Sequence, residues 1–269
     1  MVFNPFPDNL AILWDLIAAV ISFICVLLLV ETNGRIQKSG KVSTIITRKV
    51  VHIFAAPIYV VTWLLFSGSI FTRFIALIVP LIFCVQFILI GTGRIEDEEF
   101  VGSMSRSGDP SELLQGTLYY AITMIIITVF WFYIPFSGNI ANANPTAFIV
   151  LGSLAGGDGL ADIIGRKYGG NKKLGIAGSE KTLFGSLAMF TGSFLVSFLL
   201  LLIFSFEIPS FNPIFLIPAL LIISFIATLA ELLSPKGTDN IFIPISVIIM
   251  ILLFSIFLPA LWPFNFLGF

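Results

Sequence analysis

The chain has 269 residues, of which 58% are hydrophobic and only 11% are charged, and its mean hydropathy is +1.06. Soluble domains have about 25% charged residues, so this composition excludes an ordinary soluble enzyme and indicates an integral membrane protein. The formal net charge is −1, which leaves no excess of basic residues for DNA or RNA, and we expect no nucleic-acid partner.

Eight apolar runs are long enough, at about 1.5 Å per residue, to cross about 30 Å of hydrocarbon as helices. They cover residues 10–30, 50–66, 70–90, 118–134, 145–164, 183–206, 214–233 and 241–261. The second run is short, and glycines and two aspartates interrupt the fifth. We therefore predict an all-α, polytopic membrane protein with about eight transmembrane helices, forming a single domain over residues 1–269.

The basic residues divide unevenly between the two sets of loops that eight spans would create. Thirteen of the 14 lie in the loops after the first, third, fifth and seventh spans, and only Arg73 lies elsewhere. Because cytoplasmic loops retain Lys and Arg, we predict an outside N-terminus and an active site on the cytoplasmic side. No basic or Ser-rich leader precedes the first run, which favours a prokaryotic plasma membrane, with an internal photosynthetic membrane as the alternative.

Two polar motifs near the second and fourth spans contain candidate catalytic residues. The motif RKVVH places Arg48 and His52 one helical turn apart, and His52 could orient a hydroxyl or a phosphate. The alternative is an interfacial anchor. Asp109, at the turn that precedes the fourth span, is a second candidate, with a solvated loop as its alternative.

The densest polar signal is the glycine-rich segment 152–186, GSLAGGDGLADIIGRKYGGNKKLGIAGSEKTLFGS, which holds ten of the 22 glycines. On a helix, Asp158, Asp162 and Arg166 project from one face. Each charge near the bilayer costs about 2.5–3.5 kcal/mol on insertion scales, so the two carboxylates need a compensating ligand. Since Mg²⁺ binds one or two carboxylates plus substrate phosphates, we predict a magnesium site at Asp158 and Asp162.

The same segment also carries groups that complement a triphosphate. Backbone N–H groups at glycines can approach phosphate oxygens closely, and lysines and arginines can neutralise them. The candidate nucleotide-binding residues are Gly157, Gly159, Gly165, Arg166, Lys167, Thr182, Gly185 and Asn240. The candidate catalytic residues are Asp162, Lys181, His52 and Asp109. Glu180 and Asp162 stand where a Walker A loop and the dinucleotide fingerprint need glycine, so the site would be of another type.

Close helix packing is the alternative interpretation of this segment. Ser153, Gly157, Ala161, Gly165 and Gly169 recur every four residues, which is typical of the small-residue contacts between membrane helices. Asp158 would then form a structural ion pair with Arg166 or Lys167, and the basic loop would be a topology signal. The residues alone leave both interpretations open.

The blocks GGDGLADIIGRKYG and EKTLFGS resemble the GDG-x-AD-x-x-GR-x-x-G and K-[ST]-x-x-GS blocks of phytol, farnesol and dolichol kinases. The stretches RKVVH, FTRFIALIVP, SRSGDPSELLQGTLYY and TDNIFIPI resemble further segments of phytol and farnesol kinases, so the likeness covers residues 48–245. The resemblance implies a membrane kinase that transfers the terminal phosphate of CTP, or another NTP, to a prenol such as phytol, geranylgeraniol or farnesol, with Mg²⁺. One departure is Ala-Gly-Ser-Glu at residues 177–180, where phytol kinases usually carry Asn-Pro.

Two other functions are alternatives. A CTP-dependent phosphatidate cytidylyltransferase shares a Lys-Thr-x-x-Gly element, although its usual C-terminal Lys-Asp and Asp-Arg-x-Asp signature is not found in this sequence. An ion-coupled transporter would use Asp158, Asp162 and Glu231 to line an ion path. Such a path needs polar residues across the membrane midplane, whereas only Asp15 lies towards the other side. The sequence gives Asp15 no function.

Overall fold

A computed structural model of the chain describes residues 5–69, 71–105, 107–133, 144–171, 174–175, 180–206 and 211–267. Throughout these ranges the regular secondary structure is helical, without strands, which confirms the predicted all-α fold class. Some residues used in the sequence argument lie outside the described ranges, namely Arg106, Lys172, Lys173 and residues 177–179.

Eight helical stretches of the described chain are long and apolar enough to cross a membrane. They are Asp8–Lys38, Thr44–Leu65, Thr72–Gly91, Pro110–Trp131, Thr146–Tyr168, Leu183–Ser205, Pro213–Leu233 and Asp239–Phe257. Each overlaps one predicted run in the same order, so the expected set of eight transmembrane helices is confirmed. Which end of the bundle faces the cytoplasm stays a prediction.

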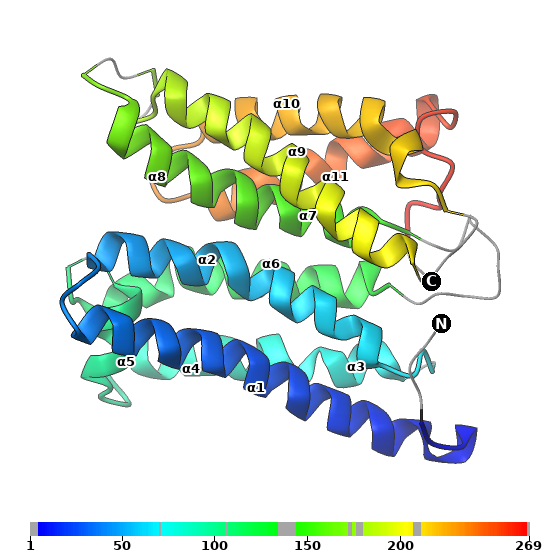
Figure 1. Cartoon of the computed structure of the whole chain (residues 1–269), viewed down its shortest axis with the longest axis horizontal. Helices are drawn as coiled ribbons and strands as arrows, with labels where there is room; N and C mark the ends of the chain where they lie inside the picture. The colour runs from blue at the N-terminus through cyan, green and yellow to red at the C-terminus, as the bar shows by residue number, and fades with distance from the viewer. Residues whose placement is uncertain are drawn as a thin grey trace.

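The long helices lie side by side, with α1, α2, α4 and α6 on one side of the bundle and α7 to α11 on the other (Figure 1). Their bounds are α1 Ala11–Lys38, α2 Thr44–Val61, α3 Thr72–Ala76, α4 Ile78–Gly91, α5 Glu98–Met104, α6 Gly116–Trp131, α7 Thr146–Gly152, α8 Gly159–Tyr168, α9 Leu183–Ser205, α10 Ile217–Leu233 and α11 Asp239–Phe257. Side-chain caps and prolines begin several of these stretches. Asp109 and Asn212 cap 3₁₀ turns that open with proline, and Thr182 caps α9.

The fifth span is the central element of the bundle. In its most apolar window 78% of the residues are buried, compared with 33–44% in the other seven spans. Its glycines allow this burial, because a Cβ on Gly152 would lie 2.7 Å from the Ser197 backbone on α9. A Cβ on Gly192 of α9 would in turn lie 2.6 Å from the Gly156 carbonyl oxygen. The packing interpretation of the small residues therefore holds for this part of the segment.

Between α7 and α8 the fifth span contains a π-helical turn, Ser153–Asp158. Such turns interrupt the regular α-helical spacing and are frequent at functional sites. The turn ends at Asp158, and α8 then carries Asp162 and Arg166 at ordinary α-helical spacing. The first four-residue step of the predicted small-residue ladder, from Ser153 to Gly157, therefore falls in π rather than α geometry.

Asp15, which the sequence left without a function, ties α1 to the start of α3. Its side chain is fully buried and accepts hydrogen bonds from the Ser67 amide at 2.7 Å and the Thr72 hydroxyl at 2.6 Å. The hydroxyls of Ser67 and Ser69 donate to it at 2.9 and 3.2 Å. These donors satisfy the buried carboxylate, so Asp15 is a structural residue at the end of the bundle where α1 begins.

Candidate active site

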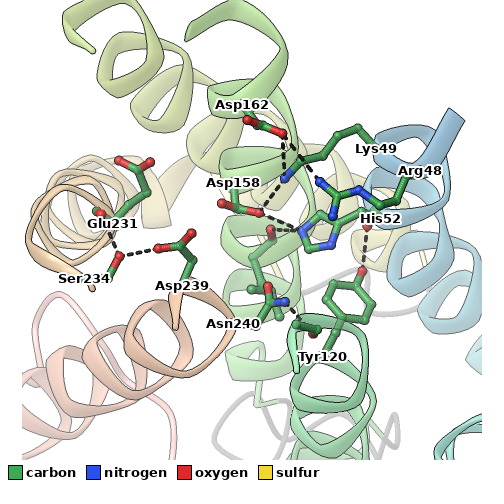
Figure 2. A network of polar contacts seen from close by, with 12 residues as sticks. Arg48, Lys49, His52, Tyr120, Asp158, Asp162, Glu231, Ser234, Asp239 and Asn240 are labelled. Carbon is green, nitrogen blue, oxygen red and sulfur yellow. Dashed lines mark hydrogen bonds and ion pairs between the residues drawn. The ribbon is translucent and has the colours of Figure 1, made fainter. Parts of the chain in front are cut away.

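Most charged side chains of the site gather at the end of the bundle opposite to Asp15. At this end α1 connects to α2, α4 to α6, α8 to α9, and α10 to α11. Figure 2 shows Asp158 and Asp162 facing Arg48, Lys49 and His52 of α2, with further groups from α6, α10 and α11 around them. These four connections are the ones that hold most of the basic residues. The fold therefore brings together, in one place, groups that lie up to about 190 positions apart in the chain.

The most buried part of the site joins α2 to the π-turn. Lys49 is only 6% exposed, and its Nζ lies 3.0 Å from Asp158 Oδ2. His52 Nε2 lies 3.1 Å from the same oxygen and 3.2 Å from the Leu154 carbonyl oxygen. Tyr120 holds the histidine in place, since its hydroxyl donates to the His52 carbonyl at 2.8 Å and its ring centroid lies 4.7 Å from the imidazole. A buried carboxylate thus has two partners on one helix.

Lys49 is a site residue that the sequence argument missed. The motif RKVVH drew attention to Arg48 and His52, but Lys49 lies three residues before His52 and therefore on the same helical face. A lysine at the start of an apolar span, on the face of a histidine, is the signal that could have found it.

Asp162 lies one turn further along α8 and is surrounded by cations. Arg166 Nε lies 2.7 Å from Asp162 Oδ1, while Lys49 Nζ and Arg48 Nη2 lie 3.7 and 3.8 Å from Oδ2. Despite these charges, Asp162 Oδ2 is buried without a hydrogen bond from any described residue. The arrangement leaves one carboxylate oxygen available for a further ligand.

A second ion cluster surrounds Lys181, just before α9. Its Nζ lies 2.6 Å from Glu231 Oε1 and 3.1 Å from Asp239 Oδ2, and the Ser234 hydroxyl donates to the other Asp239 oxygen. Burial lowers the pKa of Lys181, but the carboxylates of Asp158, Asp239 and Glu231 outweigh burial and raise it above its usual value. Lys181 is therefore a fixed positive charge at neutral pH.

Two adjoining cavities open between these clusters. The larger, about 420 Å³, has charged and polar residues at one end and a mainly apolar lining along α1, α2, α4 and α6. The smaller, about 110 Å³, is lined by Lys49, Asp158, Ala161, Asp162, Gly165, Arg166, Glu180, Lys181, Thr182, Gly185, Glu231 and Asp239. Lys49, Asp158 and Asp239 line both cavities. The larger, mainly apolar cavity and the smaller, charged cavity thus share a wall of three charged residues.

Most of the predicted site residues line one of these cavities. His52 and Asn240 line the larger one, together with Asp158. The smaller cavity is lined by seven predicted residues of the glycine-rich segment, one of which, Asp158, lines both cavities. They are Asp158, Asp162, Gly165, Arg166, Lys181, Thr182 and Gly185. Asn240 donates to the Gly116 carbonyl at 2.6 Å, and its own Oδ1 is buried without a hydrogen bond from the described residues.

Four predicted residues line neither cavity. Asp109 is exposed and caps a 3₁₀ turn, where hydrogen bonds from the Ser111 backbone and side chain lower the pKa of its carboxyl. Lys167 is also exposed, with its Nζ 5.1 Å from the centroid of the Tyr168 ring. The structure therefore does not place Asp109 where a catalytic base would act, because local capping takes up its carboxylate.

Gly157 and Gly159 are the other two, and their surroundings are side chains of neighbouring helices. A Cβ on Gly157 would lie 2.7 Å from Met189 Sδ, and one on Gly159 would lie 2.9 Å from Ile53 Cδ1. Close packing accounts for both glycines. In contrast, Gly165 and Gly185 approach each other beside the smaller cavity, where a Cβ on Gly165 would lie 3.3 Å from Gly185 Cα.

No group of three or more histidine, cysteine or carboxylate side chains in the described ranges is arranged to hold a metal ion by itself. Asp158 and Asp162 nevertheless line the same small cavity. Mg²⁺ commonly takes one or two carboxylates and completes its shell with phosphate oxygens and water. The magnesium role of these two aspartates stays a prediction.

Comparison with known proteins gives a consistent set of relatives. The chain is 39% identical over 161 residues, 60% of its length, to a protein of Oryza sativa subsp. japonica named as a probable phytol kinase 1, chloroplastic. It is 34% identical to farnesol kinase, chloroplastic, of Arabidopsis thaliana over 71% of its length, and 30% identical to phytol kinase 1, chloroplastic, of the same plant over 82%. The matched parts are 48%, 59% and 70% of these relatives, so the chain spans about half the length of the first. No protein-family model and no solved structure gives a match.

These relatives correct the expected location. The absence of a leader favoured a prokaryotic plasma membrane, but the matching proteins are chloroplastic proteins of plants. The prokaryotic expectation was wrong, because it relied on the first residues of the chain instead of on the part that the relatives share.

Proposed function

The chain belongs to the polyprenol kinase family, and from this premise we propose that it transfers the terminal phosphate of a nucleoside triphosphate to the hydroxyl of a prenol. Phytol, geranylgeraniol and farnesol are the acceptors we propose, and CTP is the donor that the sequence resemblance implies. The observation that carries the proposal is the pair of adjoining cavities, one mainly apolar and one charged, with three residues in their common wall.

The larger cavity suits a prenyl chain whose hydroxyl stays at the polar end. Along α6 its lining extends from Gly116 to Met124, which is about 12 Å at the α-helical rise. Apolar side chains of four helices line its length, including Val26, Val79, Phe83 and Ala55. Binding sites for small molecules typically combine such an apolar lining with a few oriented polar groups.

The smaller cavity suits the phosphates of the donor. Arg166 and Lys181 supply positive charge, and Thr182 caps α9 while Gly185 belongs to its first turn, where the N-terminal dipole also favours anions. The residues fit a magnesium ion as well, because Asp158 and Asp162 line the same cavity and Asp162 Oδ2 is buried without a hydrogen bond. When bound there, Mg²⁺ would neutralise phosphate charge and polarise the transferred group.

The reaction needs positioning more than covalent chemistry by the protein. The prenol oxygen forms a bond to the terminal phosphorus, the bond to the bridging oxygen breaks, and its electron pair leaves with the nucleoside diphosphate. The hydroxyl proton passes to a base, for which His52 is our candidate. Its Nε2 faces two acceptors, Asp158 and the Leu154 carbonyl, so Nε2 carries the hydrogen and Nδ1 keeps the lone pair.

The test is a turnover assay on the purified protein in detergent with Mg²⁺. CTP, ATP, GTP and UTP are each offered with phytol, geranylgeraniol and farnesol, and mass spectrometry detects prenyl monophosphate and the nucleotide product. We expect prenyl monophosphate with nucleoside diphosphate from the parent, loss of turnover in Asp162→Asn, and normal turnover in Glu31→Gln on the exposed face of α1. A parallel reaction offers phosphatidate in place of the prenol, and release of pyrophosphate there, without prenyl monophosphate from the prenols, would instead indicate a cytidylyltransferase.

A further inference from the structure

Lys49 occupies a position that no other described cation shares, because it lines both cavities. Arg48 lines only the larger cavity, while Arg166 and Lys181 line only the smaller one. From this position we propose that Lys49 is a catalytic residue whose ammonium group contacts the phosphoryl group as it moves from donor to acceptor. The proposal rests on the proposed kinase function and adds a residue to it.

The burial of Lys49 requires a reason. A charged lysine inside a membrane span costs several kcal/mol unless it is paired. One carboxylate would suffice for pairing, yet Lys49 Nζ lies 3.0 Å from Asp158 and 3.7 Å from Asp162. The side chain is thus held between the two carboxylates of the phosphate cavity, at its junction with the apolar one.

The donor count of an ammonium group fits this position. Lysine has three N–H donors, of which one forms the 3.0 Å hydrogen bond to Asp158, while Asp162 at 3.7 Å contributes its charge without a hydrogen bond. The remaining donors are available for a phosphoryl oxygen at the junction. Arginine would hold the same two carboxylates with a broad, planar group, whereas the compact ammonium acts as a point charge.

A fixed charge at this place would act on the transition state. In phosphoryl transfer, negative charge spreads over the equatorial oxygens of the moving group, and preorganised donors in a water-poor site stabilise that charge. Lys49 takes no part in the proton transfer, since the hydroxyl proton goes to His52 and the electron pair leaves with the diphosphate. Its contribution is therefore expected in kcat and not in the affinity for either substrate.

The test compares Lys49→Met and Lys49→Arg with Lys38→Met, which changes an exposed lysine paired with Glu99 at the same end of the bundle. The measurements are kcat, the KM values for CTP and geranylgeraniol, binding of the non-hydrolysable donor β,γ-methylene-CTP, and thermal stability in detergent. For Lys49→Met we expect about 10²- to 10³-fold lower kcat, as for loss of one transition-state donor, with both KM values and donor binding within about threefold. Lys38→Met should match the parent.

Lys49→Arg keeps a positive charge beside Asp158, so it separates contact with the phosphoryl group from ion pairing even if Lys49→Met fails to fold. We expect it to fold and bind the donor but to lose at least about tenfold in kcat. Parent-like kcat in Lys49→Arg, or loss of donor binding that accounts for the whole effect, would overturn the proposal. If the parent itself makes no prenyl phosphate, the kinase function fails first and the Lys49 proposal with it.

Discussion

Ala55 should help to set the length of prenol that the larger cavity accepts. It is a buried α2 residue in the cavity lining, six positions after Lys49 and therefore about 9 Å deeper along the helix axis. At about 1.2 Å per bond of an extended chain, this depth corresponds to roughly seven bonds, or about two isoprene units. Geraniol would end near Ala55, whereas geranylgeraniol and phytol would extend past it.

Ala55→Leu adds three carbon atoms to the wall at this depth. If three methylenes of a long prenol are no longer buried in the cavity, at about 0.8 kcal/mol each, the free energy of binding weakens by about 2.4 kcal/mol. At about 1.4 kcal/mol per factor of ten, kcat/KM for geranylgeraniol should fall roughly 50-fold. The value for geraniol should change little, because that chain ends before the new side chain.

The assay is kcat/KM for geraniol, farnesol and geranylgeraniol at saturating CTP, in the parent, in Ala55→Leu and in Ala230→Leu. Ala230 is a half-buried alanine of α10 that lines neither cavity, so its variant controls for general effects of the larger side chain. Equal losses for the three prenols, or no loss for geranylgeraniol, would refute the assignment of this cavity to the prenyl chain.

Three further predictions concern stability and pH. Asp15→Ala should lower the thermal stability of the detergent-solubilised protein by about 3 kcal/mol or more, since it leaves buried donors unpaired, while kcat of the folded fraction stays near the parent value. Gly192→Ala should cost about 1–3 kcal/mol in the same melting experiment because its Cβ meets the Gly156 backbone, whereas Gly102→Ala, with nothing within 4 Å of the new Cβ, should not. The raised pKa of Lys181 means that its charge stabilises the site below its ordinary pKa, about 10.4, and that this stabilisation is lost only as pH rises through the higher folded-state value. The affinity for β,γ-methylene-CTP should therefore not fall through loss of the Lys181 charge between about pH 7 and 10. A fall in affinity over that range that is absent in Lys181→Met would contradict this prediction.

The fold was largely predictable because each span is a local property of the sequence. Twenty or so apolar residues in a row form a helix in a bilayer whatever they pack against, since only a helix satisfies the backbone there. The glycine-rich segment was also located correctly as a polar insertion at one end of the bundle. The sequence could not decide between helix packing and ligand binding for its glycines, because both occur within the segment. Gly157 packs against α9, while Gly165, two turns later, lines a cavity.

The site was less predictable where its parts come from distant helices. The contact between Lys49 and Asp158 joins residues 109 positions apart, and Lys181 meets Glu231 and Asp239 only because α9, α10 and α11 end together. The spacing of residues within one helix predicts which of them share a face, but it cannot predict contacts between different helices. Asp109 is a case in which the sequence suggested a catalytic residue that the structure explains locally. Its carboxylate accepts a hydrogen bond from the backbone N–H of Ser111, two residues later.

The π-turn at Ser153–Asp158 sets how α7 and α8 are rotated relative to each other about the axis of the fifth span. An α-helix rotates by about 100° per residue, and a π-turn absorbs roughly one extra residue without breaking the helix. Deleting that residue would restore a regular α-helix with nearly the same angle between α7 and α8, whereas winding all the residues of the turn as α-helix would rotate α7 against α8 by about 100°. In the second case either the α7 packing or the aspartates would face the wrong neighbours, so the π geometry of this one turn determines where the carboxylates point.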